Sequence, residues 1–162
     1  MGNKKTEITE KLETPKSLKI LCIMSFIGFA LAMAVDTGNY LSYSSIDSLK
    51  TSANQAGWEM MEDKLDLYNA NGLDISEKGT MRISLMFIYR SILDVLALLG
   101  VSMMFIRLKL GFVIYAIFQA AYAAIPFVMF GTAGGLIIGN ASIAITLVYI
   151  ALFLTQKRHL IR

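Results

Sequence analysis

Three charged side chains lie well inside long apolar stretches of this sequence: Asp36 in residues 18–43, and Arg90 and Asp94 in residues 81–106. A charge inside a membrane helix is costly unless it is paired or hydrated, so such residues mark a buried polar contact or a path for ions. Arg90 and Asp94 are four residues apart and therefore share one face of a helix. We predict a buried site in which Arg90 lies between the two aspartates.

Polar side chains in the later apolar stretches fall at a similar height in the membrane. At a rise of about 1.5 Å per residue, Asp36 lies about 9 Å and Arg90 about 12 Å below the outer surface, and Asp94 lies near the middle of the bilayer. Measured in the same way, Asn140 lies about 9 Å, Tyr122 about 13 Å and Gln119 about 18 Å from the outer ends of their helices. We therefore predict that these three side chains surround Arg90 with hydrogen bonds.

This polar site has two interpretations, which the sequence leaves open. A buried arginine flanked by two carboxylates, with amide and phenol partners, fixes the register of packed helices without transporting anything. The same groups also suit a pathway for protons or cations, or a site for a small polar ligand. Two acids against one base leave one carboxylate partly uncompensated, which supports the second interpretation. The sequence by itself favours the first.

Motifs of known enzyme chemistry are absent from the sequence. The single cysteine, Cys22, has no partner for a redox pair, and the single histidine, His159, lies in the basic C-terminal tail. No cluster of His, Cys and carboxylate residues has the spacing of a metal or haem site, so we expect no cofactor. The residues before Asp36 and Asp94 do not match the GxGD or YD contexts of intramembrane aspartyl proteases. We expect a protein that is not an enzyme.

The composition and the distribution of charge indicate a membrane protein. Of the 162 residues, 56% are hydrophobic and 17% are charged, whereas a soluble domain carries about 25% charged residues. Residues 110–156 contain no Asp, Glu, Lys, Arg or His. That run makes roughly 70 Å of helix, enough for two crossings of the bilayer, and the glycines at 131–135 break it. The positive residues flank the apolar runs as topology signals do, so we expect no nucleic-acid partner.

These patterns predict an all-α membrane protein. We expect a bundle of four transmembrane helices in the lipid bilayer, with an extra-cytoplasmic amphipathic helix between the first and the second. The predicted spans are residues 18–43, 81–106, 110–130 and 134–155. The predicted connections are a tail at 1–17, a helical segment at 44–80, turns at 107–109 and 131–133, and a tail at 156–162.

The lysines and arginines predict the orientation of these spans. Ten of them fall in residues 1–19, 107–109 and 156–162, and four fall in residues 44–82. Positive charge resists translocation across the membrane, so the first group is expected on the cytoplasmic side. Both termini are therefore expected in the cytoplasm.

The first span has an alternative interpretation as a cleaved signal peptide. Basic residues precede its apolar core, and Ala32-Met33-Ala34 resembles a cleavage site, after which the chain would begin at Val35. The apolar run continues to Tyr43, which makes it longer than the core of a signal peptide. We therefore expect a span that is retained.

The segment between the first two spans has apolar residues at three- and four-residue spacing and an excess of acidic residues, which predicts an amphipathic helix. Asp74 and Glu77 resemble a capping box and predict that the second membrane helix begins close to them. We expect the apolar face of the segment to rest on the bundle or on lipid headgroups. The alternative is a surface for a membrane-protein partner that uses Trp58, Met60 and Met61.

Small residues recur at the spacing that lets membrane helices approach closely. Two stripes of them lie in the third and fourth predicted spans: Ala116, Ala120 and Ala124, and Gly131, Gly135 and Gly139. We predict that the two stripes pack against each other within the chain, rather than forming a dimer contact.

One stretch, residues 96–131, carries a family resemblance. It contains Leu-Leu-Gly-Val-Ser-Met-Met-Phe, then a basic turn, then Gly-Phe-Val-Ile-Tyr-Ala-Ile-Phe-Gln and Ile-Pro-Phe. In these features it resembles uncharacterised bacterial four-helix integral membrane proteins. The resemblance implies a bacterial inner membrane and no particular activity. On the sequence we expect a structural or accessory membrane subunit, and the alternative is a small transporter or channel that uses Asp36, Arg90 and Asp94.

Overall fold

The structure is a computed structural model that describes residues 15–51 and 55–160, with the backbone alone for Asn140 and Ala141. The described residues are almost entirely helical, and no strand occurs among them. The elements are α2 (Lys16–Ser44), α3 (Ile46–Thr51), α4 (Gln55–Ala70), α5 (Glu77–Phe105), α6 (Lys109–Gln156) and the short 3-10 helix η1 (Lys157–His159).

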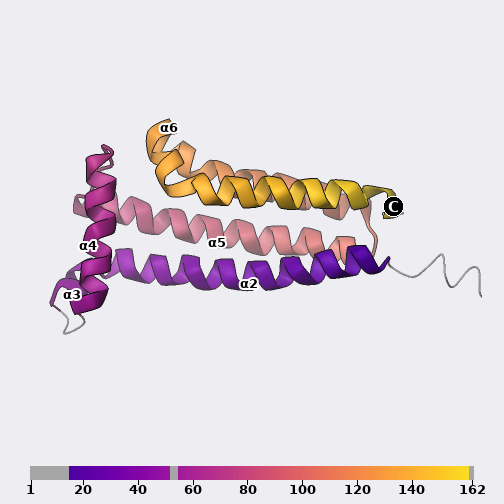
Figure 1. The fold of residues 1–162 in the computed structure, drawn as a ribbon, viewed down its shortest axis with the longest axis horizontal. Coiled ribbons are helices and arrows are strands. Elements are labelled where there is room, and N and C mark those ends of the chain that lie inside the picture. The colour runs from indigo at the N-terminus through magenta and orange to yellow at the C-terminus, as the bar shows by residue number, and fades with distance from the viewer. Residues whose placement is uncertain (1–14, 52–54, 161–162) are drawn as a thin grey trace, which may run out of the picture.

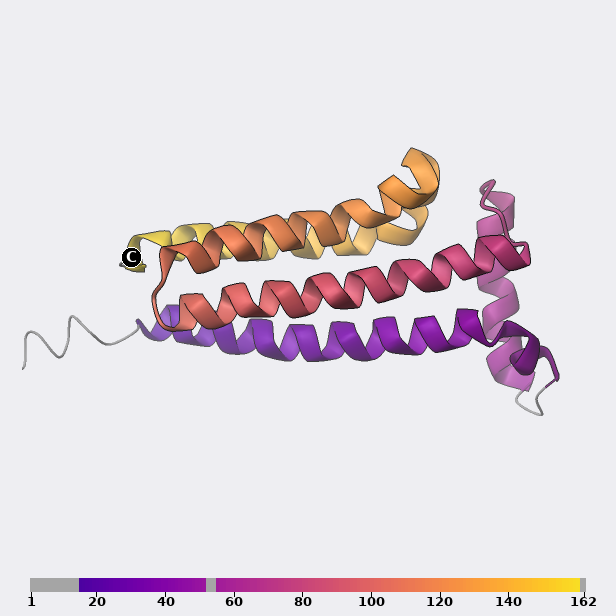
Figure 2. The same ribbon diagram turned by 180° about the vertical axis from the view of Figure 1, so that it is seen from behind.

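Three long helices lie side by side, and α4 crosses one end of them (Figure 1). Helix α5 packs against both α2 and α6, whereas α2 and α6 contact each other at few places. The start of α2, the turn between α5 and α6, and η1 all lie at the opposite end (Figure 2). We call the two ends the α4 end and the basic end, because the second carries Lys16, Arg107, Lys109 and Lys157.

Three helices in the described part of the chain are long and apolar enough to cross a membrane: α2, α5 and Lys109–Gly139 of α6. Both the exposed side and the packed side of these helices are apolar. Along α2, large apolar side chains at three- and four-residue spacing are each at least half exposed: Ile20, Ile23, Ile27, Leu31 and Val35. Helices that are hydrophobic all round are typical of a membrane bundle. The chain therefore has the helices of a multi-pass membrane protein.

Helix α6 reverses direction at a kink. Gly131 has φ 70° and ψ −172°, a conformation outside the helical region that glycine adopts without steric cost. The part of α6 after the kink runs back beside the part before it (Figure 2). The guanidinium of Arg82 in α5 donates a hydrogen bond to the carbonyl of Met129, 2.8 Å away, and so ties α5 to the kink. The turn predicted at 131–133 is shorter in the structure, because Thr132 and Ala133 already belong to the helix that follows.

The ends of α5 differ from the sequence prediction by a few residues. The helix begins at Glu77, and its N-cap is Ser76, whose hydroxyl accepts a hydrogen bond from the backbone N–H of Gly79. Asp74 lies two residues before the N-cap, and its carboxylate accepts a hydrogen bond of 2.9 Å from the backbone N–H of Ser76. That bond holds the pKa of Asp74 below its ordinary value. The predicted capping box at Asp74 and Glu77 is therefore wrong.

The polar residues of the bundle lie between two apolar clusters. The cluster at the basic end includes Leu18, Phe29, Val101, Tyr115 and Phe153. The cluster at the α4 end includes Tyr43, Met61, Leu65, Met86 and Phe87. Along α2, Asp36 falls between Phe29 of the first cluster and Tyr43 of the second. The two clusters hold the helices in register on both sides of the polar residues.

The two small-residue stripes do not pack against each other as predicted. Ala120 and Ala124 are exposed and Ala116 is half-buried, so the alanine stripe faces away from the glycines. Gly131 is exposed at the kink. The glycines that do pack, Gly135 and Gly139, lie against the two residues Pro126 and Phe127. The predicted contact between the two stripes is therefore wrong.

The tight contact is instead between α5 and the start of α6. A Cβ added at Gly100 would lie 2.6 Å from the backbone nitrogen of Tyr115 and 2.7 Å from the Gly111 carbonyl oxygen. A Cβ added at Gly111 would in turn lie 2.6 Å from the Gly100 carbonyl oxygen. The two backbones therefore touch at this pair of glycines, as small residues allow in membrane helices.

Helix α4 contributes one buried face to the cluster at the α4 end. Met61 is buried in that cluster, and Trp58 is half-buried with the ammonium of Lys50 5.3 Å from its ring. Met60 is 67% exposed, so it alone of the three residues predicted to bind a partner lies open to the surroundings. Gly57 lies within α4, and Asn71 and Gly72 follow its last turn.

Candidate functional site

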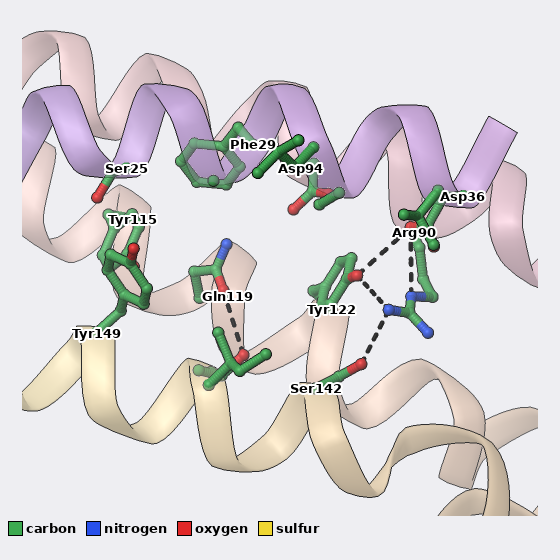
Figure 3. Close-up of a pocket in the computed structure, with 16 residues that line it drawn as sticks. Ser25, Phe29, Asp36, Arg90, Asp94, Tyr115, Gln119, Tyr122, Ser142 and Tyr149 are labelled. Atoms are coloured by element: carbon green, nitrogen blue, oxygen red, sulfur yellow. Dashed lines mark hydrogen bonds and ion pairs between the residues drawn. The ribbon is translucent and has the colours of Figure 1, made fainter. Parts of the chain in front are cut away.

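A cavity of about 510 Å³ lies at the middle of the bundle. Its wall is built from α2, α5 and both halves of α6 (Figure 3). Five of the six residues predicted to form the polar site line it: Asp36, Arg90, Asp94, Gln119 and Tyr122. The sixth, Asn140, has a side chain that lies outside the described part of the structure. The volume is in the range of cavities that hold small molecules in proteins, roughly 300–1,000 Å³.

The guanidinium of Arg90 is held by groups from α2 and from both halves of α6. Its Nε lies 3.5 Å from Oδ2 of Asp36, and its Nη2 donates hydrogen bonds to the hydroxyls of Tyr122 and, at 2.9 Å, of Ser142. Its carbon Cζ also lies 4.2 Å from the centre of the Tyr122 ring, which is a cation–π distance. The Tyr122 hydroxyl in turn donates to Asp36 at 3.4 Å. These contacts tie α2, α5 and both halves of α6 together at one height.

Asp94 stands apart from this network, although it lines the same cavity. Its side chain is almost fully buried, with 2% of the residue exposed. The oxygen Oδ2 has no hydrogen-bond partner among the described residues, and Asp94 forms no ion pair among them. The amide of Gln119 is its hydrogen-bonding neighbour and points toward it in Figure 3. Asp94 is therefore a buried acid in the cavity wall, with one oxygen that has no hydrogen-bond partner among the described residues.

The arrangement differs from the sequence prediction in how Arg90 is paired. We predicted Arg90 between the two aspartates, on the ground that Arg90 and Asp94 share a helix face. Among the described residues, Arg90 forms its ion pair with Asp36, and Asp94 lies one turn nearer the basic end (Figure 3). Gln119 lies beside Asp94 rather than Arg90 and accepts a hydrogen bond of 3.3 Å from Thr146.

The sequence prediction missed several polar residues of the wall. Ser142 and Thr146 lie four residues apart in the second half of α6, and Tyr149 follows at the next turn. A polar stripe at three- and four-residue spacing in an otherwise apolar helix is a signal that could have found them. Ser25 of α2 also lines the cavity, and its hydroxyl has no hydrogen-bond partner among the described residues. It lies 11 positions before Asp36 and carries no sequence signal of its own.

The cavity wall offers two acids, one arginine, and hydroxyl and amide groups. No group of three or more His, Cys, Asp or Glu residues that could hold a metal ion occurs in the described ranges.

No protein-family model, curated protein or solved structure matches this chain. The resemblance to bacterial four-helix membrane proteins therefore stays a prediction.

Proposed function

We propose that this protein is a four-span membrane carrier that binds a proton or a small cation at Asp94. The observation that carries this proposal is the cavity, whose wall includes Asp94, an acid with one buried oxygen that has no hydrogen-bond partner among the described residues. A carboxylate inside a membrane bundle is expensive, and a dry structural contact would pair it fully. Of the two functions expected from the sequence, this favours the transporter over the structural subunit.

The proposal includes a fourth crossing of the membrane and an orientation. The second half of α6 returns beside the first half toward the basic end, which supports a fourth span (Figure 1). The excess of lysine and arginine at the basic end supports a cytoplasmic location for it, in a bacterial inner membrane. The helix α4 then lies on the outer face.

The orientation is tested by labelling single cysteines in intact cells. In a Cys22→Ser background, Glu62→Cys in α4 is expected to react with an impermeant thiol reagent, and Arg158→Cys at the basic end is expected to react only after the cells are opened. Both positions are exposed in the structure. Reaction of Arg158→Cys in intact cells would reverse the proposed orientation.

The carrier function is tested by flux into reconstituted vesicles. We expect the unmodified protein to carry protons or cations down an imposed gradient, and Asp94→Asn to abolish that flux while the helical content stays unchanged. Asp63→Asn, which removes an exposed acid of α4, is the matched control and is expected to keep the flux. If the unmodified protein moves neither protons, sodium nor potassium, the carrier proposal for these ions fails.

An accessory subunit is the second candidate function. It is supported by the exposed apolar side chains of Met60 and Leu67, which lie seven residues apart on one face of α4 and are 67% and 54% exposed. A photocrosslinking residue at position 60 is expected to capture a specific membrane protein if this function holds. The same residue at position 62, an exposed acidic position of α4 that lies away from the face of Met60 and Leu67, is the control.

A further inference from the structure

We propose that the natural ligand of the cavity is a lipophilic amine, protonated at its nitrogen, that enters from the bilayer between α2 and the second half of α6. This inference rests on the proposed carrier function and specifies the ligand of the same site. It follows from where the cavity opens, from the polar groups left available inside it, and from the charge balance of its wall.

The cavity opens sideways, toward the lipid. Three of its lining residues are large apolar side chains that are more than half exposed, Leu31 and Val35 of α2 and Ile145 of α6. Helices α2 and α6 make few contacts with each other, so the space between them is where the wall is incomplete. Toward the basic end they approach again at Gly28, where an added Cβ would lie 3.6 Å from the Tyr149 hydroxyl. The opening is therefore apolar and faces the membrane.

Three residues of the cavity wall have a buried polar atom with no hydrogen-bond partner among the described residues: Oδ2 of Asp94, the hydroxyl of Ser25 and Nε of Arg90. Nε of Arg90 lies 3.5 Å from Asp36 in the ion pair, so the Asp94 carboxylate is the acid that lacks such a contact. An ionised carboxylate accepts hydrogen bonds and donates none, so a ligand that satisfies it must bring donors. A protonated amine brings up to three of them on one atom.

The charges of the wall favour a cation over an anion. Arg90 is neutralised by Asp36, and its Nη2 is engaged by Tyr122 and Ser142. The second acid, Asp94, has no such counter-ion among the described residues. An amine bound at Asp94 would therefore complete a second ion pair, whereas an anion would meet an uncompensated carboxylate.

The remainder of the wall selects for an apolar body. Phe29, Leu31, Ala32, Val35 and Ile145 contribute hydrocarbon surface beside the polar groups. A ligand that combines a protonated amine with an aromatic or aliphatic body matches both parts of the wall. Such molecules also partition into lipid, which gives them access to an opening that faces the bilayer.

Three matched fluorescent probes test the proposal: pyrenemethylamine, pyrenemethanol and pyrenecarboxylate. They share one apolar body and differ in the charge of the head group. Binding is measured on the full chain in lipid nanodiscs, and the signal from empty nanodiscs is subtracted. We expect saturable binding of the amine, with affinity falling by about tenfold or more in Asp94→Asn because a charge-assisted contact is lost. Binding of pyrenemethanol should be weak and unchanged by the substitution.

A second variant keeps the test informative if Asp94→Asn fails to fold. Ala32→Trp places a large ring in the cavity wall and is expected to weaken amine binding, whereas Ile20→Trp, on the lipid-facing side of the same helix and outside the cavity, should leave it unchanged. Equal affinity for amine and alcohol would overturn the ligand class. Preference for the carboxylate would overturn the charge argument.

The experiments distinguish failure of the amine proposal from failure of the carrier proposal. If proton or cation flux depends on Asp94 but no probe binds saturably, the amine proposal fails and the carrier function stands. If the amine binds at Asp94 without any flux, the ligand site holds and the carrier function fails.

Discussion

The two membrane aspartates are predicted to differ sharply in what they contribute to stability. Asp36 is the ion-pair partner of Arg90 at 3.5 Å and accepts a hydrogen bond from Tyr122. Asp94 forms neither kind of contact with Arg90. Asp36→Asn therefore leaves a buried guanidinium without its counter-ion, whereas Asp94→Asn removes a buried charge that has no ion-pair partner in the described structure. Asparagine keeps nearly the same shape in both cases, so the comparison isolates the charge.

The size of the difference can be worked from these contacts. Removing one partner of a buried ion pair costs about 3–5 kcal/mol. The lower figure applies to Asp36→Asn, because Arg90 keeps its hydrogen bonds to Tyr122 and Ser142 and its contact with the Tyr122 ring. A cost of about 3 kcal/mol lowers the melting temperature by roughly 6–12 °C in a chain of this size. Asp94→Asn is expected to change the free energy of unfolding by less than about 1 kcal/mol.

The assay is thermal unfolding in detergent and in nanodiscs, followed by circular dichroism, with the exposed Asp63→Asn as the control. The double variant Asp36→Asn with Arg90→Met is expected to recover much of the loss, because replacing both members of a buried pair is close to neutral. If Asp94→Asn lowers the melting temperature as much as Asp36→Asn does, Arg90 is held by both acids and the reasoning from the structure is wrong.

Two further predictions concern the glycine contact and the start of α5. Gly100→Ala is expected to destabilise the protein by about 1–3 kcal/mol, since its Cβ would overlap the backbone of α6, whereas Gly38→Ala, with no described atom within 4 Å, should be neutral or slightly stabilising in thermal unfolding. Folding lowers the pKa of Asp74, so its contribution to stability is present above the unfolded-state pKa of about 3.9 and is lost as the pH falls through the folded value. Asp74→Asn should therefore remove part of the acid dependence of unfolding, and an unchanged acid limb would contradict this.

The sequence determined the kind of protein and the charged residues of the polar site. Long apolar runs with few charges predict membrane helices because the backbone has no other way to satisfy its hydrogen bonds in lipid. The same runs make each interior charge conspicuous, which is how Asp36, Arg90 and Asp94 could be singled out. Their heights could be estimated from the rise of a helix, and the structure brings all three to one cavity.

The tertiary structure decided how those residues are paired. Helical spacing places Arg90 and Asp94 on one face, but it does not give the direction in which a long arginine side chain extends, and that direction joins it to Asp36. From the last part of the chain, Ser142 contacts Arg90, in the half of α6 where Gly135 and Gly139 pack against Phe127 and Pro126 after the kink.

The cavity and the helix contacts also depended on packing that a single sequence does not contain. The alanine stripe has the spacing of a helix interface, yet α6 turns it outward, and the close approach forms instead at Gly100 and Gly111. In lipid an exposed apolar side chain carries no penalty, so hydrophobic pattern does not say which face of a membrane helix is packed. The position of the space between α2 and α6, beside Asp94, therefore depends on how the whole bundle packs.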